Sequence, residues 1–243
     1  MRWEPPPQKG EKGKHMSFSY EKKYINLKIC GIDEAGRGPL AGPVVVAGVI
    51  LKNPLKLFLE KDSKGLSFKK RLMYFKYILK ESENFHIEII DNEDIDKLNI
   101  YQATLKGANK VHQKLNPQIS LTDALKLETE NHIAITKGDI KSQSIAAASI
   151  LAKVTRDFIM IFIDKFFPEY CFKKHKGYPT KLHKKIVQEI GITPFHRKSF
   201  SNIKNYSLNT KNFHTFYFLK KENREKLYEN VLKLLLKVYQ VPR

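Results

Sequence analysis

The stretch GIDEAGRGP, residues Gly31–Pro39, places two carboxylates at the end of a short apolar segment. Residues 25–33 predict a β-strand, on which neighbouring side chains point to opposite faces of the sheet. Asp33 and Glu34 can therefore share one site only if the chain turns there, and the glycines and the proline that follow favour a turn. A buried acidic pair needs compensation, most simply by a divalent metal ion. The alternative is a loop in which the Asp-Glu pair only caps the chain.

Two further acids follow short apolar stretches. Asp123 comes directly after residues 119–122, and Asp139 comes shortly after residues 133–135. Carboxylates at the ends of neighbouring strands converge at one sheet edge, where α/β proteins place their sites. Such oxygens suit Mg²⁺, and two ions about 4 Å apart would activate a water and stabilise a leaving oxygen. Each acid alone is more often a turn residue, so the prediction depends on the set.

Working outward, the pattern predicts strands that alternate with helices, typical of an α/β fold with a mixed sheet flanked by helices. The first two strands are close enough in sequence to form a hairpin. Three small residues, Ala146 to Ala148, would let their helix approach the sheet closely. The predicted strands are 25–33, 43–51, 85–90, 119–123 and 132–136, and the predicted helices are 66–79, 95–115 in two pieces, 144–166 and 179–190.

The 243 residues suit one sizeable domain with appendages. Residues 1–24 are rich in Pro, Gly and Lys and predict a flexible tail. The main domain is expected over residues 25–204, followed by a C-terminal extension over 205–243. This extension contains an amphipathic helix at 222–239, which we expect to pack on the core; the alternative is a partner-binding helix. Its expected apolar face consists of Leu227, Val231, Leu234, Leu235 and Val238.

The chain is strongly basic, with 44 Lys and Arg against 25 Asp and Glu and a formal charge of +19. Such an excess favours a nucleic-acid partner, although scattered lysines are the alternative explanation. Cys30 and Cys171 have no zinc-site spacing, which fits a reducing cytoplasm. The longest apolar run, Leu40–Leu51, is about half a bilayer span, so no membrane association is expected.

Over residues 27–203 the chain resembles the ribonuclease HII family. Its segments stand in the family's order and agree densely with the family's motifs. They are residues 31–45, Asp62-Ser63-Lys64 with Leu66-Ser67, Lys137-Gly138-Asp139, residues 144–157, Lys176-Gly177-Tyr178-Pro179-Thr180 with His183, and His196-Arg197-Lys198-Ser199-Phe200. Among the departures, Ala124 follows Asp123 where the family commonly has Gly.

The resemblance implies an RNase H-like fold and a catalytic site that binds Mg²⁺ or Mn²⁺. By motif position, the catalytic, metal-binding residues are Asp33, Glu34, Asp123 and Asp139, and the substrate-binding residues are Gly36, Arg37, Gly38, Lys64, Ser144, Ser149 and Tyr178. The Gly-Arg-Gly backbone would hold a ribonucleotide 2′-hydroxyl, and Tyr178 would stack on a sugar. Without the resemblance, Tyr178 would be read as a packed aromatic, Lys64 as a solvated lysine, and the serines as a helix cap and a core residue.

The activity implied by the resemblance is hydrolysis of the phosphodiester 5′ of a ribonucleotide, in RNA/DNA hybrids or in DNA duplexes with embedded ribonucleotides. It would leave a 3′-hydroxyl and a 5′-phosphate, and we expect a cytoplasmic monomer. One alternative is a catalytically silent RNA/DNA-binding module of the same fold. Another is a structural protein that acts through residues 222–239. Ribonuclease HIII is the rival family, but it carries a separate N-terminal domain for which residues 1–24 are too short.

Overall fold

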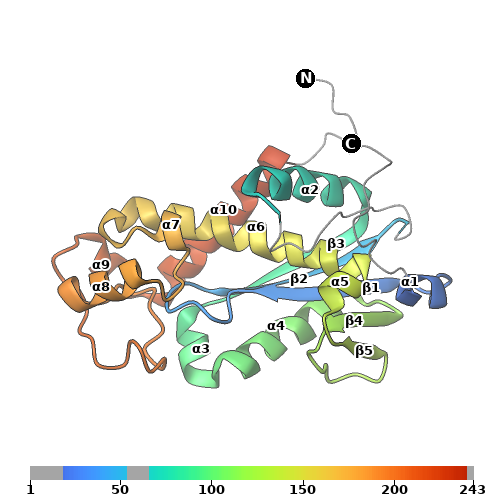
Figure 1. The fold of residues 1–243 in the computed structure, drawn as a ribbon, viewed down its shortest axis with the longest axis horizontal. Helices are drawn as coiled ribbons and strands as arrows, with labels where there is room; N and C mark the ends of the chain where they lie inside the picture. The colour runs from blue at the N-terminus through green and yellow to red at the C-terminus, as the bar shows by residue number, and fades with distance from the viewer. Residues whose placement is uncertain (1–18, 54–65, 240–243) are drawn as a thin grey trace.

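The computed structural model describes residues 19–53 and 66–239, and within them it contains one mixed five-stranded sheet. The strands stand in the order β3-β2-β1-β4-β5 (Figure 1). The pairs β1/β2 and β2/β3 are antiparallel, whereas β1/β4 and β4/β5 are parallel. The strands are β1 Ile29–Ala35, β2 Val44–Leu51, β3 Ser82–Ile90, β4 Ile119–Asp123 and β5 His132–Ile135. The predicted mixed sheet and its opening hairpin are confirmed.

Helices cover both faces of the sheet, so β2 is buried along its whole length. On one face, Val45, Ala47 and Val49 belong to a core shared with α2 Phe68–Glu81, α6 Gln143–Phe166 and α10 Lys221–Tyr239. On the other face, Val46 and Ile50 pack with α4 Ile100–Leu115. The remaining helices are α1 Ser19–Lys23, α3 Asn92–Leu98, α5 Gly138–Lys141, the 3₁₀ helix η1 Pro168–Tyr170, α7 Phe172–His175, α8 Lys181–Ile190 and α9 His214–Phe218.

Helix α6 approaches β1 as closely as the sequence predicts. A Cβ on Gly31 would lie 2.1 Å from the backbone carbon of Ser144, so only a glycine lets the first turn of α6 cross the strand. Ala146, Ala147 and Ala148 are buried directly behind this crossing. The contact fixes α6 over the sheet edge at which the predicted acids stand.

The first strand begins at Ile29 rather than at residue 25, because the chain turns before it. The Leu27 backbone N–H donates to the Tyr24 carbonyl at 2.9 Å. The segment expected to be a tail contains helix α1, and its Glu21 is buried. The Glu21 carboxylate accepts hydrogen bonds from the Ser142 hydroxyl at 2.5 Å and the Ser144 backbone N–H at 3.1 Å, and so caps the N-terminus of α6.

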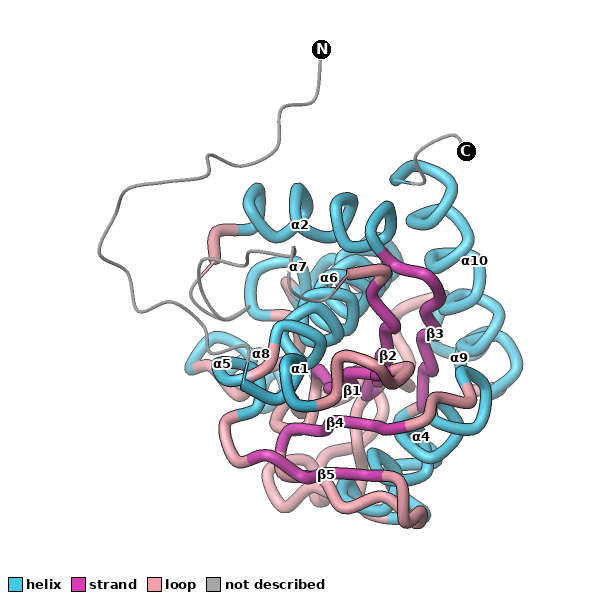
Figure 2. Tube along the Cα trace, turned by 90° about the vertical axis from the view of Figure 1, so that its right-hand side faces the viewer, coloured by secondary structure: helices cyan, strands magenta, loops and turns pink. Residues whose placement is uncertain are grey.

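The C-terminal helix α10 packs on the core, as expected, beside α2 at the end of the molecule opposite β5 (Figure 2). Its buried face differs from the predicted one, because Leu234 and Val238 are exposed. The helix is rotated so that Arg224 and Tyr228 point inward. Arg224 lies 2.8 Å from one carboxylate oxygen of Asp91, and the Tyr228 hydroxyl donates to the other. None of the helices placed by the structure is long and apolar enough to cross a membrane.

Candidate active site

Two of the predicted acids lie side by side at the ends of parallel strands. Ile32 of β1 is in register with Thr122 of β4, so the next residues, Asp33 and Asp123, are neighbours across the sheet. The Gly138 backbone N–H at the start of α5 donates to the Asp123 carboxylate at 2.9 Å. This bond ties the end of β4 to the short helix that carries Asp139. The sheet edge thus brings together Asp33 and Asp123, which stand far apart in the sequence.

Asp33 is the electrostatic centre of this group. Its side chain is buried, and burial raises the pKa of its carboxyl well above the usual range, with the Glu34 and Asp123 carboxylates raising it further. Hydrogen bonds from Ser149 and from the Glu34 backbone N–H, at 2.8 Å, oppose this rise. Three carboxyl groups therefore interact closely enough to resist being ionised together.

Glu34 and Arg37 form an ion pair at the mouth of the site. The Arg37 guanidinium lies 3.4 Å from the Glu34 carboxylate, and its own side chain is 47 % exposed. Exposure keeps this pair weak, because water screens it. Arg37 is therefore free to exchange Glu34 for another anion.

The donor chemistry of the site fits a hard divalent cation. All the candidate ligands are carboxylate oxygens, which Mg²⁺ and Mn²⁺ prefer, and the charge that accumulates around Asp33 is the charge such an ion would neutralise. In the described ranges, no three His, Cys, Asp or Glu side chains are already gathered tightly enough to hold a metal ion. Side-chain rotation at this edge would have to complete the coordination shell.

The turn after β1 is fixed by two buried arginines through its carbonyl groups. The Arg197 guanidinium donates to the carbonyls of Gly36 at 2.6 Å, Arg37 at 3.0 Å and Pro39 at 2.8 Å, and to those of Gly42 and Pro43. Arg156 donates to the carbonyls of Ala41, Pro43 and Lys176, each at 3.0 Å. Gly36 has a φ of +106°, and a Cβ there would lie 2.2 Å from Arg156 Nε. The carbonyls are thus turned inward, away from the site.

Tyr178 stands at the rim of this turn. A Cβ on Gly38 would lie 3.9 Å from Tyr178 Cε1, and the tyrosine remains 39 % exposed. The two loops are joined by a hydrogen bond from the Leu40 backbone N–H to the Gly177 carbonyl at 2.8 Å. Lys153 and Arg156 place their cationic groups 5.8 Å from the ring centre. An exposed aromatic beside a glycine turn and flanked by cations is suited to contact a sugar-phosphate backbone.

Comparison with known proteins identifies the family. The family model for ribonuclease HII matches residues 30–203, most of the chain. The chain belongs to the ribonuclease HII family. It is 50 % identical over 187 residues to a ribonuclease HII of Clostridioides difficile, a match that covers 74 % of this chain and 72 % of that protein. Membership in this family makes the protein a type 2 ribonuclease H.

Solved structures show the same fold. In the structure of the PCNA:RNase HII complex from Archaeoglobus fulgidus, the matched chain is 26 % identical with a TM-score of 0.63, covering 72 % of this chain and 96 % of that one. Bst-RNase HIII in complex with Mn²⁺ is 19 % identical with a TM-score of 0.55, covering 73 % of this chain and 68 % of the other, and supports the fold alone. The predicted RNase H-like architecture is confirmed.

Within this ribonuclease HII framework, the other expected contact residues have different surroundings. Ser149 hydrogen-bonds Asp33, so it orients an acid. Ser144 is a buried residue of the first turn of α6, and its hydroxyl has no hydrogen-bond partner in the part of the chain that the structure describes. Lys64 lies outside the described residues. Ala124 adopts a left-handed φ of +55°, which explains why the family commonly has glycine there.

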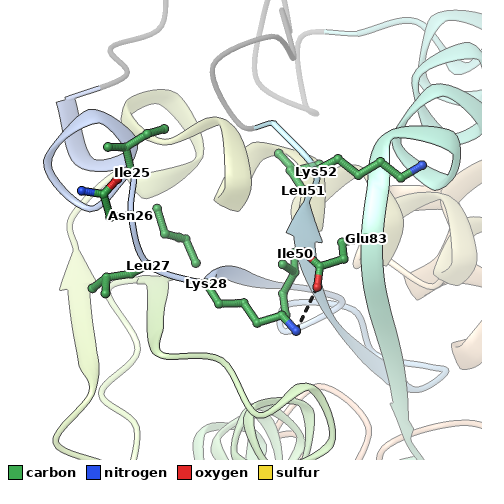
Figure 3. Close-up of a pocket in the computed structure, with 9 residues that line it drawn as sticks. Ile25, Asn26, Leu27, Lys28, Ile50, Leu51, Lys52 and Glu83 are labelled. Atoms are coloured by element: carbon green, nitrogen blue, oxygen red, sulfur yellow. Dashed lines mark ion pairs between the residues drawn. The ribbon is translucent and has the colours of Figure 1, made fainter.

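The roles of Arg156 and Arg197 were not predicted from the sequence, although both lie in the motif segments of the ribonuclease HII resemblance. Their partners are carbonyl groups, which every residue type carries, so no sequence pattern reveals them. The candidate active site is separate from a cavity near the other end of β1. A cavity of about 410 Å³ lies at the start of β1 and the end of β2, lined by residues that include Ile25, Lys28 and Glu83 (Figure 3). Asp33 is at the opposite end of β1.

Proposed function

We propose that this protein is an endonuclease that hydrolyses the phosphodiester on the 5′ side of a ribonucleotide. Its substrates would be RNA/DNA hybrids and DNA duplexes with embedded ribonucleotides, and its products a 3′-hydroxyl and a 5′-phosphate. The observation that supports this best is the adjacency of the acidic group around Asp33 to the Gly36–Gly38 turn, with both at the end of β1. Family membership supplies the reaction class.

Asp33, Glu34, Asp123 and Asp139 would hold Mg²⁺ or Mn²⁺ in this proposal. The ions, when bound, would supply an activated water and stabilise the leaving oxygen. The protein's own contribution is orientation: Ser149 and the Glu34 backbone N–H hold the Asp33 carboxylate, and the Gly138 N–H holds that of Asp123. These hydrogen-bond donors are already in place, so they lower the free energy needed to hold several carboxylates together without reorganising during the reaction.

The turn at Gly36–Gly38 would recognise the 2′-hydroxyl, the group that distinguishes RNA from DNA. The carbonyls of Gly36 and Arg37 accept hydrogen bonds from Arg197, and within the described chain the backbone N–H groups of this turn donate no hydrogen bond. These N–H groups are therefore available to a substrate oxygen. Tyr178 would stack against the adjoining sugar. Arg37 and Lys64 would contact phosphate, and the net charge of +19 predicts binding that weakens as salt rises.

The test is cleavage of an end-labelled DNA duplex containing one ribonucleotide, in Mg²⁺, Mn²⁺ or EDTA, with an all-DNA duplex as the control. We expect one metal-dependent cut directly 5′ of the ribonucleotide, and no cut by the Asp33→Asn variant. Cleavage of a long hybrid alone would contradict the single-ribonucleotide specificity. Tight binding with no cleavage of either duplex would favour the catalytically silent module instead. The monomeric state and the cytoplasmic location stay predictions.

A further inference from the structure

Three buried histidines lie directly beneath the loop that carries Tyr178. His183 and His196 are fully buried and His175 nearly so. The Nε2 atoms of His183 and His196 are 3.0 Å apart, and the rings of His175 and His183 stack with centroids 4.3 Å apart. The three histidines come from α7, α8 and the segment after α8. The cluster therefore joins these three parts of the chain next to the candidate site.

The hydrogen bonds of this cluster have only one consistent direction when the histidines are neutral. The Tyr178 carbonyl can only accept, so His183 Nδ1, at 3.0 Å, carries the proton and donates to it. At the other end the Thr193 backbone N–H donates to His196 Nδ1 at 2.9 Å, so the proton of His196 is on Nε2. His196 Nε2–H therefore donates to His183 Nε2. The result is a chain from Thr193 to the backbone of Tyr178.

His175 fixes the same loop from its other side. Its Nδ1 accepts from the Gly177 backbone N–H at 3.1 Å, and its Nε2 donates to the Tyr170 carbonyl at 2.8 Å. The peptide group before the Gly177 α-carbon and the peptide group after the Tyr178 α-carbon are thus each held by a histidine side chain. Burial lowers the pKa values of His183 and His196, which keeps both rings in the neutral form that this chain of donors requires.

We propose that the His196–His183 relay positions Tyr178, and so sets how well the enzyme recognises the ribonucleotide. This inference rests on the substrate-contacting role given to Tyr178 in the proposed function. His183 and His196 are positioning residues, because they touch the backbone of the Tyr178 loop and not the substrate. An aliphatic residue of similar size would fill the same space without fixing the direction of the Tyr178 carbonyl. An aliphatic substitution at His183 therefore distinguishes a positioning role from a role in core packing alone.

A double-mutant cycle tests the relay. His183→Leu and His183→Asn are each made in the native background and in the Tyr178→Ala background. Each variant is assayed well below its unfolding midpoint, for kcat/KM on the one-ribonucleotide duplex and for binding of that duplex in EDTA. His183→Leu should lower kcat/KM by roughly ten- to a hundredfold when Tyr178 is present, the range that follows from misplacing a contacting group by about 1 Å. In the Tyr178→Ala background the same change should cost less than about twofold.

Two control variants separate the loss of the hydrogen bond from a general effect of replacing a histidine. Asparagine can present an N–H near the position of His183 Nδ1, so His183→Asn should recover part of what His183→Leu loses. His112→Leu removes a partly buried histidine from α4, on the other side of the sheet, and should leave the cycle unchanged. Equal losses from His183→Leu in both backgrounds would show a purely structural role and overturn the relay.

Failure of the relay can be distinguished from failure of the proposed function. If Tyr178→Ala changes neither cleavage nor binding, Tyr178 is not a substrate contact and the relay proposal is overturned, while cleavage by the native protein stands. If the native protein does not cleave, the proposed function fails. The binding cycle then still decides whether His183 acts through Tyr178.

Discussion

Replacing Asp33 by asparagine should stabilise the metal-free protein while abolishing its cleavage activity. The Asp33 carboxyl is buried beside Glu34 and Asp123, and its pKa is raised well above the usual range by burial and by these two neighbours. A carboxyl with a raised native pKa binds more protons in the native state than in the unfolded state. Its contribution to stability is therefore present at low pH and lost as the pH rises towards the native pKa. Asparagine carries no charge, so the Asp33→Asn variant avoids this loss of stability at neutral pH.

The size of the effect follows from the sheet geometry. Adjacent strands lie about 4.8 Å apart, so two charges at the ends of β1 and β4 are separated by roughly 5 Å. At an effective dielectric constant of about 20 their repulsion is about 3 kcal/mol. Asparagine keeps an acceptor for the Glu34 backbone N–H but weakens the bond from Ser149. The net gain in unfolding free energy should be about 1–2 kcal/mol.

The measurement is urea unfolding of Asp33→Asn and native protein at neutral pH, first in EDTA and then in Mg²⁺. We expect the variant to be the more stable in EDTA, and only the native protein to gain stability from Mg²⁺. Glu189→Gln removes an exposed carboxylate from α8 and is the control, with an expected change below about 0.5 kcal/mol. If the variant is less stable than the native protein in EDTA, the Asp33 carboxylate is not destabilised by its neighbours Glu34 and Asp123, and the prediction is wrong.

Three further perturbations probe other parts of the fold. Ala124→Gly should stabilise the protein by about 0.5–1 kcal/mol, because it relieves a left-handed backbone at φ +55°; no gain in unfolding midpoint would contradict this. Burial lowers the pKa of His183 from 6.5 to about 4 in the folded protein. Between these two pH values the unfolded chain binds a proton at His183 that the folded protein does not bind. The free energy of unfolding should therefore fall by about 3 kcal/mol as the pH is lowered from 6.5 to 4. A flat pH profile in denaturant titrations would exclude this. Arg224→Met should cost about 3–5 kcal/mol by leaving Asp91 buried without its cation, with Lys233→Met on the exposed face of α10 as the control.

Much of the fold could be predicted because each element carries a local signal. The valine-rich run of β2, the helix pair at 95–115 and the Ala-rich start of α6 follow from periodicity and residue size. The adjacency of Asp33 and Asp123 could be predicted because each ends an apolar strand. The position of α1 could not, because the carboxylate of Glu21 docks it on the start of α6, far away in the sequence.

The exposed face of α10 shows why periodicity alone misplaced a helix. Leu234 and Val238 are apolar, yet they face solvent, because Arg224 and Tyr228 turn inward to reach Asp91. A buried ion pair to a residue more than a hundred positions away leaves no mark in the local hydrophobic pattern. The same limit applies to His183 and His196, because the groups at the two ends of their relay, the Tyr178 carbonyl and the Thr193 N–H, are backbone groups that almost any residue type carries.

The use of backbone partners also protects the chemistry of the site. Arg156 and Arg197 lie against the turn that directly follows Asp33 and Glu34, and a guanidinium paired with Asp33 would neutralise it and compete with a metal ion. In the structure both arginines donate their hydrogen bonds to carbonyls between Gly36 and Pro43, and Arg156 also donates to the Lys176 carbonyl. The interactions that shift the pKa of Asp33 accordingly include other carboxylates and no arginine. Arginines that support the turn and an acidic group at Asp33 that pairs with neither of them can therefore exist within a few residues of each other.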